Sequence, residues 1–182
     1  AVVESLETKD YLKAARVAEE EFARTHDSAA LLQQLNALYR ANRLFEFEEV
    51  FHREYKGDLH GDDQKLIRLL GIKAFLTLRK TNFAKDLIQD AERQDGESLE
   101  LDFLRATLFG LEANFSEARE ALERINRKCP SRPRILIRLI QVCEQMRDYP
   151  AAVGYLKHAL RITNNSAELM AKRHRYQGLG LW

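Results

Sequence analysis

Proline, glycine and cysteine are scarce in this protein. Its 182 residues include three prolines, eight glycines and two cysteines. Because proline and glycine are the residues that break helices, their scarcity favours long helices. The two thiols, Cys129 and Cys143, cannot supply a disulfide framework or a four-cysteine zinc site. Their low number favours a reducing compartment.

Long apolar runs are also lacking. Charged residues interrupt every apolar stretch well before the ~20 residues that a membrane-spanning helix needs. No basic segment followed by an apolar one opens the sequence, so a secretory signal is not indicated. We therefore expect no membrane insertion and a cytoplasmic location. The sequence begins at Ala1 rather than Met, as a processed product or an excised fragment would.

A surplus of one charge is absent as well. There are 29 basic and 28 acidic side chains, which give a net charge of +1. Proteins that bind nucleic acid over a broad surface have a basic surplus, because phosphate contacts dominate their affinity. The balance argues against nucleic acid as a partner, and it confines any electrostatic site to a local surface.

What the sequence does contain is a repeat. The stretch "ANFSEAREALERINRKCP" (113–130) is echoed 34 residues later by "RDYPAAVGYLKHALRITN" (147–164). Two antiparallel helices approach to ~8–10 Å only where small side chains lie at the contact. The alignment therefore predicts alanines at helix contacts and aromatic residues covering the turns that precede them. The aligned pairs are Phe115 with Tyr149, Ala118 with Ala152, and Leu122 with Leu156.

Weaker copies precede these two, in residues 9–22, 43–51 and 81–92. The aromatic residues that would follow each turn are spaced 34, 38, 32 and 34 residues apart; they are Tyr11, Phe45, Phe83, Phe115 and Tyr149. In the second copy Leu44 is an equally good candidate for this position. A longer connection over residues 56–64 accounts for the spacing of 38.

A helix–turn–helix unit of 34 residues with this pattern resembles the tetratricopeptide repeat, most clearly in residues 99–165. No Trp opens a unit and Leu70-Gly71 is out of register, so half-a-tetratricopeptide and other helical hairpin repeats stay open as the subfamily. The resemblance implies an all-α superhelix, or solenoid, of about five antiparallel helix pairs in a single domain over residues 1–182. The expected pairs are 3–25, 28–55, 64–93, 98–128 and 132–163, followed by a capping helix over 166–177.

Apolar patterning distinguishes the two helices of a pair. Residues 132–146 are apolar nearly all round, which is typical of a buried helix, whereas residues 150–162 have one apolar face. We therefore expect the first helix of each pair to be inner and the second outer. In a right-handed solenoid the first helices would then line a concave groove.

Three rows of residues at the repeat spacing would face that groove. The rows are Glu100, Arg134 and Glu168; Leu104, Arg138 and Lys172; and Thr107, Gln141 and Arg175. The first row alternates in sign, as a ladder of salt bridges between inner helices would. The other two lack acidic members, which predicts unpaired positive charge at Arg138, Lys172 and Arg175.

Unpaired positive charge in the groove predicts an acidic peptide segment, or the carboxyl terminus of a polypeptide, as the ligand. The predicted partner-binding residues are Arg134, Arg138, Gln141, Lys172 and Arg175. A solvated basic face on the capping helix is the alternative. Some tetratricopeptide domains hold a terminal carboxylate in a Lys/Asn/Arg clamp; Arg134 and Arg138 imitate its basic pair, but the matching position one repeat earlier is Leu104 rather than Asn.

Signs of chemistry are weak elsewhere. Glu49 and His52 have the Glu-x-x-His spacing found in di-iron helical bundles, but those sites need a second copy of the motif and the sequence has none. The loop 58–63 holds three carboxylates and a His, but their spacing matches no metal-binding loop. We predict no metal, cofactor or catalytic residue. The expected function is a non-enzymatic scaffold or adaptor for a protein or peptide, within a larger complex. The alternatives are self-assembly through the solenoid ends, using Val2, Val3 and Leu6, and RNA binding by helical repeats.

Overall fold

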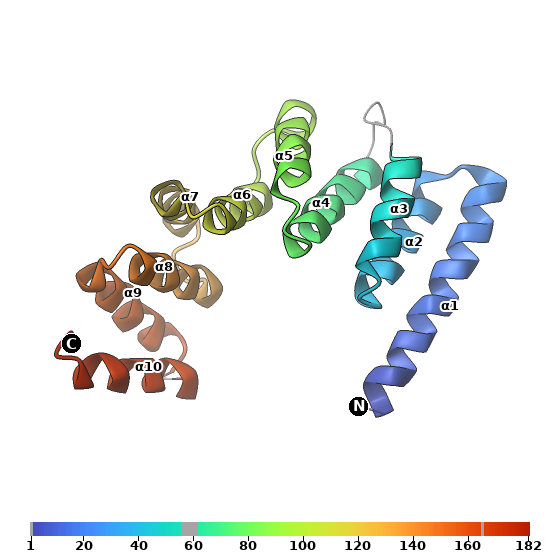
Figure 1. Cartoon of the computed structure of the whole chain (residues 1–182). Coiled ribbons are helices and arrows are strands. Elements are labelled where there is room, and N and C mark those ends of the chain that lie inside the picture. Colours follow the sequence, from blue (N-terminus) through green and yellow to red (C-terminus); the bar gives the residue numbers. More distant parts are fainter. Residues whose placement is uncertain (1, 56–61, 165) are drawn as a thin grey trace. The chain divides into compact units, whose positions relative to one another are not determined.

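The computed structural model describes residues 2–55, 62–164 and 166–182, with side chains from residue 10 onward and, after the gap, from residue 63 (Figure 1). This part of the protein is built from helices without a strand, as the sequence predicts. The helices are α1 (Val2–Thr25), α2 (Ser28–Arg40), α3 (Leu44–Glu54), α4 (Asp62–Thr77), α5 (Thr81–Asp95), α6 (Leu99–Leu111), α7 (Phe115–Lys128), α8 (Pro133–Gln145), α9 (Tyr149–Ile162) and α10 (Ala167–Gly178).

Contacts between helices divide the molecule into two compact units. Unit 1 comprises residues 1–97 and unit 2 comprises residues 98–182. The expectation of one domain over residues 1–182 therefore stays a prediction.

The same tight turn joins the helices of four hairpins. The middle residue of each turn has a positive φ of 56° to 60°; these residues are Asn42, Arg79, Ala113 and Arg147, at spacings of 37, 34 and 34. In every case the next amide donates to the carbonyl five residues earlier, as Asn114 does to Phe109 at 2.8 Å. This geometry ends a helix while satisfying its last carbonyls. The turns therefore set the period of the repeat.

This register corrects two of the aromatic positions expected from sequence. The residue that opens the second helix is Leu44, Thr81, Phe115 or Tyr149. Leu44 is thus the counterpart of Phe115, whereas Phe45 is 74% exposed. Phe83 lies two residues too late and is 47% exposed. The expected spacings of 38 and 32 become 37 and 34, because the turn rather than the nearest aromatic defines the unit.

Three residues further on, each second helix fully buries one side chain. Phe47, Ala84, Ala118 and Ala152 all occupy this position, and all have 0% exposure. The predicted burial of Ala118 and Ala152 is confirmed. Alanine here allows the two helices of a hairpin to approach closely.

The predicted helix pair in residues 3–25 is wrong. Residues Val2–Thr25 form the single helix α1, which contains neither glycine nor proline to interrupt it. Tyr11 lies in the middle of this helix and follows no turn. A pattern of an aromatic residue and an alanine three positions later is not enough to define a hairpin without a turn signal before it.

Unit 1 has an aromatic core between α3 and α4. Gly71 permits the approach of these helices, because a Cβ atom at this position would lie 2.5 Å from the Phe51 ring. The Phe51 ring in turn stacks on Tyr55 and meets Phe75 edge-on. Arg68, only 2% exposed, donates to both carboxylate oxygens of Asp95 at 2.9 Å and so ties α4 to α5.

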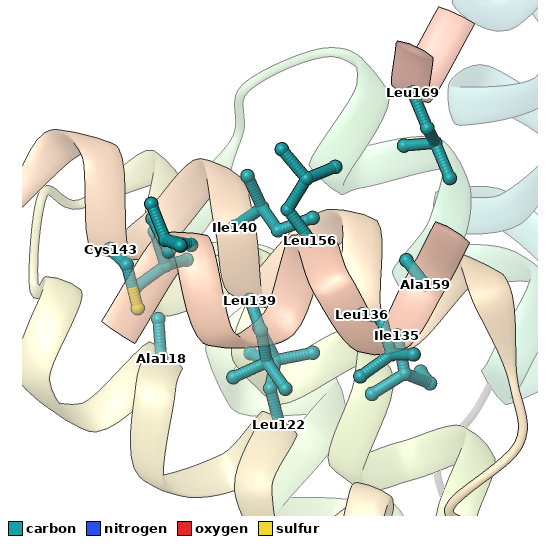
Figure 2. Packing of buried hydrophobic residues seen from close by; sticks show 14 of the residues in the cluster. Ala118, Leu122, Ile135, Leu136, Leu139, Ile140, Cys143, Leu156, Ala159 and Leu169 are labelled. Atoms are coloured by element: carbon teal, nitrogen blue, oxygen red, sulfur yellow. The ribbon is translucent and has the colours of Figure 1, made fainter. Parts of the chain in front are cut away.

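The core of unit 2 draws side chains from five helices, since Ala106 of α6 joins residues of α7, α8, α9 and α10. Figure 2 shows cluster residues of α7, α8, α9 and α10, among them Leu122, Leu139, Leu156 and Leu169. Helix α8 buries six residues around much of its circumference. Helix α9 buries Ala152, Val153, Leu156, Ala159 and Leu160 on one face. The predicted contrast between a buried first helix and a one-sided second helix is confirmed in this pair.

The capping helix predicted at 166–177 is present as α10, with Ser166 at its N-cap and Gly178 as its last residue. The tail beyond it folds back onto unit 2. The Trp182 ring lies 4.9 Å from Lys157 Nζ and 5.4 Å from Arg173 Cζ, so two cations face its π-system. Within the described residues, no helix has the length and apolar character needed to cross a membrane.

Candidate functional site

A groove in unit 2 contains two of the predicted binding residues. Its cavity of about 340 Å³ lies between α6 and α8, above the start of α7. Arg138 and Gln141 line it, and Arg138 Nη1 donates a long hydrogen bond of 3.5 Å to Gln141 Oε1. Arg138 is the one charged group among the lining residues, which are Phe103, Ala106, Thr107, Gly110, Leu111, Phe115, Leu122, Arg138, Gln141, Val142 and Gln145.

The predicted residue Arg134 lies at a neighbouring hollow of about 500 Å³. This second hollow is bounded by the start of α6, the end of α7 and the start of α8. Its apolar floor includes Leu99 and Ile135, and its rim includes Arg132 and Arg134. Phe103 lines both hollows, so they are adjacent on one side of unit 2.

Lys172 and Arg175 do not present unpaired charge, and this part of the prediction is wrong. Both contact Glu144 of α8: Lys172 Nζ lies 2.7 Å from Glu144 Oε2, and Arg175 Nη2 lies 3.0 Å from Glu144 Oε1. The hydroxyl of the buried Tyr176 donates to Glu144 Oε1 at 2.6 Å. These contacts attach α10 to α8, so the two cations serve packing of the capping helix.

Electrostatics at Glu144 reflect this arrangement. Burial by itself raises the pKa of the Glu144 carboxyl, but hydrogen bonds from Lys172 and Tyr176 and the charges of Lys172 and Arg175 outweigh it. The pKa of Glu144 is therefore held below its usual value. The same hydrogen bond, together with burial as the larger cause, raises the pKa of Tyr176 above its ordinary range.

The rows expected from the repeat spacing are only partly groove-facing. Leu104 belongs to the second row, yet it is buried in the core of unit 2. The spacing places residues on equivalent helix positions, but α6 is more deeply buried at this point than α8. Thr107 and Gln141 of the third row do line the same cavity. Arg134 and Glu168 of the first row are both exposed.

Glu144 is the important residue that sequence reasoning missed. It lies one turn past the row residues of α8, while its partners lie 28, 31 and 32 residues later on α10. These separations are shorter than the 34-residue repeat, so a search at the repeat spacing passes over them. The available signal was a lone acidic residue near the end of α8.

The structure gives no support to the weaker candidates for a metal-binding or catalytic site. His52 Nε2 lies 3.5 Å from Glu48 rather than near Glu49, and its ring packs against Phe83. Cys143 is buried, which raises the pKa of its thiol. Among the described residues, no group of three or more His, Cys, Asp or Glu side chains could hold a metal ion. Most of the loop 58–63 and the side chains of Val2, Val3 and Leu6 lie outside the described residues.

Among the comparisons with known proteins, the one with solved structures supports the fold. No family model matches the sequence, and no curated protein resembles it in sequence. Solved structures of MamA, a TPR-like helical solenoid, are similar in backbone. MamA AMB-1 (P212121) shares 17% identity at a TM-score of 0.68, over 87% of this chain and 92% of MamA. MamA MSR-1 shares 14% identity at a TM-score of 0.67, over 92% of this chain and 100% of the solved MamA chain.

Proposed function

We propose that this protein is a non-enzymatic interaction module that binds a protein or peptide segment in the groove between α6 and α8, as a scaffold or adaptor within a larger complex. The TPR-like fold supports protein partners, because helical hairpin arrays present extended binding surfaces. The observation that carries the proposal is the groove itself. It combines apolar side chains with polar ones, among them Arg138 and Gln141.

The groove has the features of a segment-binding site. Phe103, Leu111 and Phe115 supply apolar surface, and such surface holds the anchor side chains of a bound segment. Arg138 supplies a planar set of donors that suits a carboxylate. Lys172 and Arg175, which both pair with Glu144, take a supporting role by holding α10 in place.

Gly110 offers a direct test, because it lines the groove and a Cβ atom at this position would meet no atom within 4 Å. Peptides that bind the intact protein would first be selected from a random 12-residue display library. Gly110→Leu should then weaken their binding at least about tenfold by filling the groove. Gly154→Leu is the matched control, since Gly154 is also a helical glycine with open space beside it. Failure to select any peptide, or equal binding by both variants, would refute the proposal.

A second candidate function is association between copies of the protein. It is favoured by the exposure of Phe45 and Phe83 on the second helices of unit 1, since exposed large apolar side chains often mark contact surfaces. Light scattering over a dilution series tests it directly. A constant monomer mass at all concentrations would exclude this function.

A further inference from the structure

Basic residues accumulate in one segment of an otherwise balanced sequence. Residues 124–143 contain six basic residues and no acidic residue. The six are Arg124, Arg127, Lys128, Arg132, Arg134 and Arg138. Over all 182 residues the numbers of basic and acidic side chains are nearly equal, at 29 and 28. The surplus is therefore local to the end of α7, the connection to α8, and the first half of α8.

Most of this charge is available at the surface. Arg124 is engaged, with Nη2 3.5 Å from Asp102 Oδ1. Arg127, Lys128, Arg132 and Arg134 are exposed. Of these four, Arg127 also interacts electrostatically with Glu123. We call these four residues the basic edge. Helix α8 adds positive potential of the same sign, because it begins here and has no acidic residue in its first turn.

An apolar hollow lies beside two residues of the basic edge, Arg132 and Arg134. It is the cavity of about 500 Å³ already described, with Leu99, Phe103, Ile125 and Ile135 in its lining. Arg132 and Arg134 border it, and Glu100 is the one acidic residue in the lining. A binding site with an apolar floor and a basic rim selects a ligand that combines a large apolar group with negative charge.

We propose that the basic edge docks an acidic protein segment whose large apolar side chain enters this hollow. The inference rests on the proposed function, and it names the partner's chemistry and adds Arg127, Lys128 and Arg132 to the binding surface. Arginine forks pair with carboxylates in a bidentate manner. Phe103 is the one aromatic ring in the lining, so the hollow offers little stacking surface for the bases of a single-stranded nucleic acid.

The positions of the arginines also set the spacing of the acidic residues. Arg134 and Arg138 lie one turn apart on α8, which is a rise of about 6 Å. Alternate residues of an extended segment are separated by about 6.6 Å. A segment with carboxylates at alternate positions can therefore face both arginines while it passes from the hollow to the groove, which share Phe103.

The test uses a fluorescein-labelled 12-residue peptide with Glu at alternate positions around one central Phe. We expect it to bind the intact protein at low salt at least about tenfold more tightly than the same peptide with Gln in place of Glu. Replacing the Phe by Ala should also weaken binding, because the hollow is then left unfilled. Twelve-residue oligouridylate should bind more weakly than the Glu peptide.

Variants locate the site. Arg132→Glu with Arg134→Glu should weaken peptide binding at least about tenfold, since two attractive pairs become repulsive. The control is Arg147→Glu with Arg161→Glu, which makes the same change of charge at exposed sites elsewhere in unit 2. Its affinity for the peptide should stay within about twofold of that of the original protein. Arg132→Gln with Arg134→Gln, checked by circular dichroism, covers the case in which the first variant fails to fold.

The outcomes separate this inference from the proposed function. Equal binding of the Glu and Gln peptides, tighter binding of oligouridylate, or no effect of the Arg132 and Arg134 variants overturns the inference. If library-selected peptides still bind and remain sensitive to Gly110→Leu, the proposed function stands without it. If the Glu peptide and the library peptides all fail to bind, both are lost.

Discussion

At the scale of single residues, side-chain size at one position of each hairpin governs how closely its helices pack. Ala84, Ala118 and Ala152 occupy that position with 0% exposure, and Phe47 takes it in the hairpin of α2 and α3. The aromatic residue in the first hairpin shows that the position requires burial. Alanine is the solution that the other three hairpins share.

Replacing these alanines should strain unit 2. Ala118→Leu and Ala152→Leu should each lower the free energy of unfolding by about 1–3 kcal/mol, because the added methyl groups have no space between the helices. Urea unfolding followed by circular dichroism measures the loss. Ala171→Leu on the exposed face of α10 is the control and should change stability by less than about 0.5 kcal/mol. Unchanged stability at both buried sites would mean that the repeat register is wrong.

Glu144 is the second residue whose removal should be informative. Glu144→Gln should cost about 1–2 kcal/mol at pH 7, because Lys172, Arg175 and Tyr176 lose their shared carboxylate. The folded-state pKa of Glu144 lies below its ordinary value of 4.5. Its contribution is therefore present above that pH and is lost as the pH falls through the folded-state pKa.

Urea unfolding at pH 7 and at pH 3.5 should accordingly show a gap between the original protein and Glu144→Gln that narrows at the lower pH. Glu168→Gln on the same capping helix serves as the control, since Glu168 is exposed. A gap that is equally wide at both pH values would show that the ionised carboxylate is not what holds α10.

At the scale of helices, the hairpin turn is the element that repeats most faithfully. Its positive-φ residue is Asn, Arg, Ala or Arg, so no side-chain preference unites the four turns. What they share is a pair of hydrogen bonds back into the preceding helix. Links between successive second helices recur too, with reversed charges: Glu48 pairs with Lys80 in unit 1, and Arg119 pairs with Asp148 in unit 2.

Replacing a helical glycine by alanine should have opposite effects on stability in the two units. Gly71→Ala should destabilise unit 1 by about 1–3 kcal/mol, because the new methyl group would overlap the Phe51 ring, which Phe47, Tyr55 and Phe75 hold in place. Gly154→Ala should stabilise α9 by about 0.5–1 kcal/mol, since open space surrounds it. Both changes are measured by thermal or urea unfolding. A stabilising Gly71→Ala would contradict the packing of α3 on α4.

At the scale of the whole molecule, each of the two units has its own buried core. The cluster from Ala106 to Tyr176 lies wholly within unit 2, and the cluster around Phe51 and Arg68 lies within unit 1. Residues in a self-contained core do not need the other unit to bury their apolar surface.

We therefore expect residues 98–182, expressed alone, to fold. The fragment should give a helical circular dichroism spectrum and a cooperative thermal transition, and Ala152→Leu should lower its midpoint. A control fragment of residues 115–182, which lacks α6 and therefore the partner of α7 in its hairpin, should unfold more easily. A coil spectrum for residues 98–182 would show that the protein is one cooperative domain over its whole length.

Much of the architecture could be predicted from the sequence alone, because periodic apolar positions and the 34-residue echo depend only on local order along the polypeptide. These features were sufficient for the all-α class, for the hairpins from α2 to α9, for the burial of Ala118 and Ala152, and for the capping helix α10. They failed in α1, where the aromatic and alanine pattern occurs without a turn, and at Phe45 and Phe83, where an aromatic near the turn is not the one that packs.

Tertiary structure decided the electrostatics. Equivalent positions at the repeat spacing predict which residues share a face, but a charge is free or neutralised according to what lies within about 4 Å of it in space. Glu144 pairs with Lys172 and Arg175 across two helices at a separation that the repeat does not contain, whereas Arg132 and Arg134 stay exposed beside an apolar hollow. Helix formation depends on residues that are close in the sequence, whereas the pairing of charges depends on how the helices pack against one another.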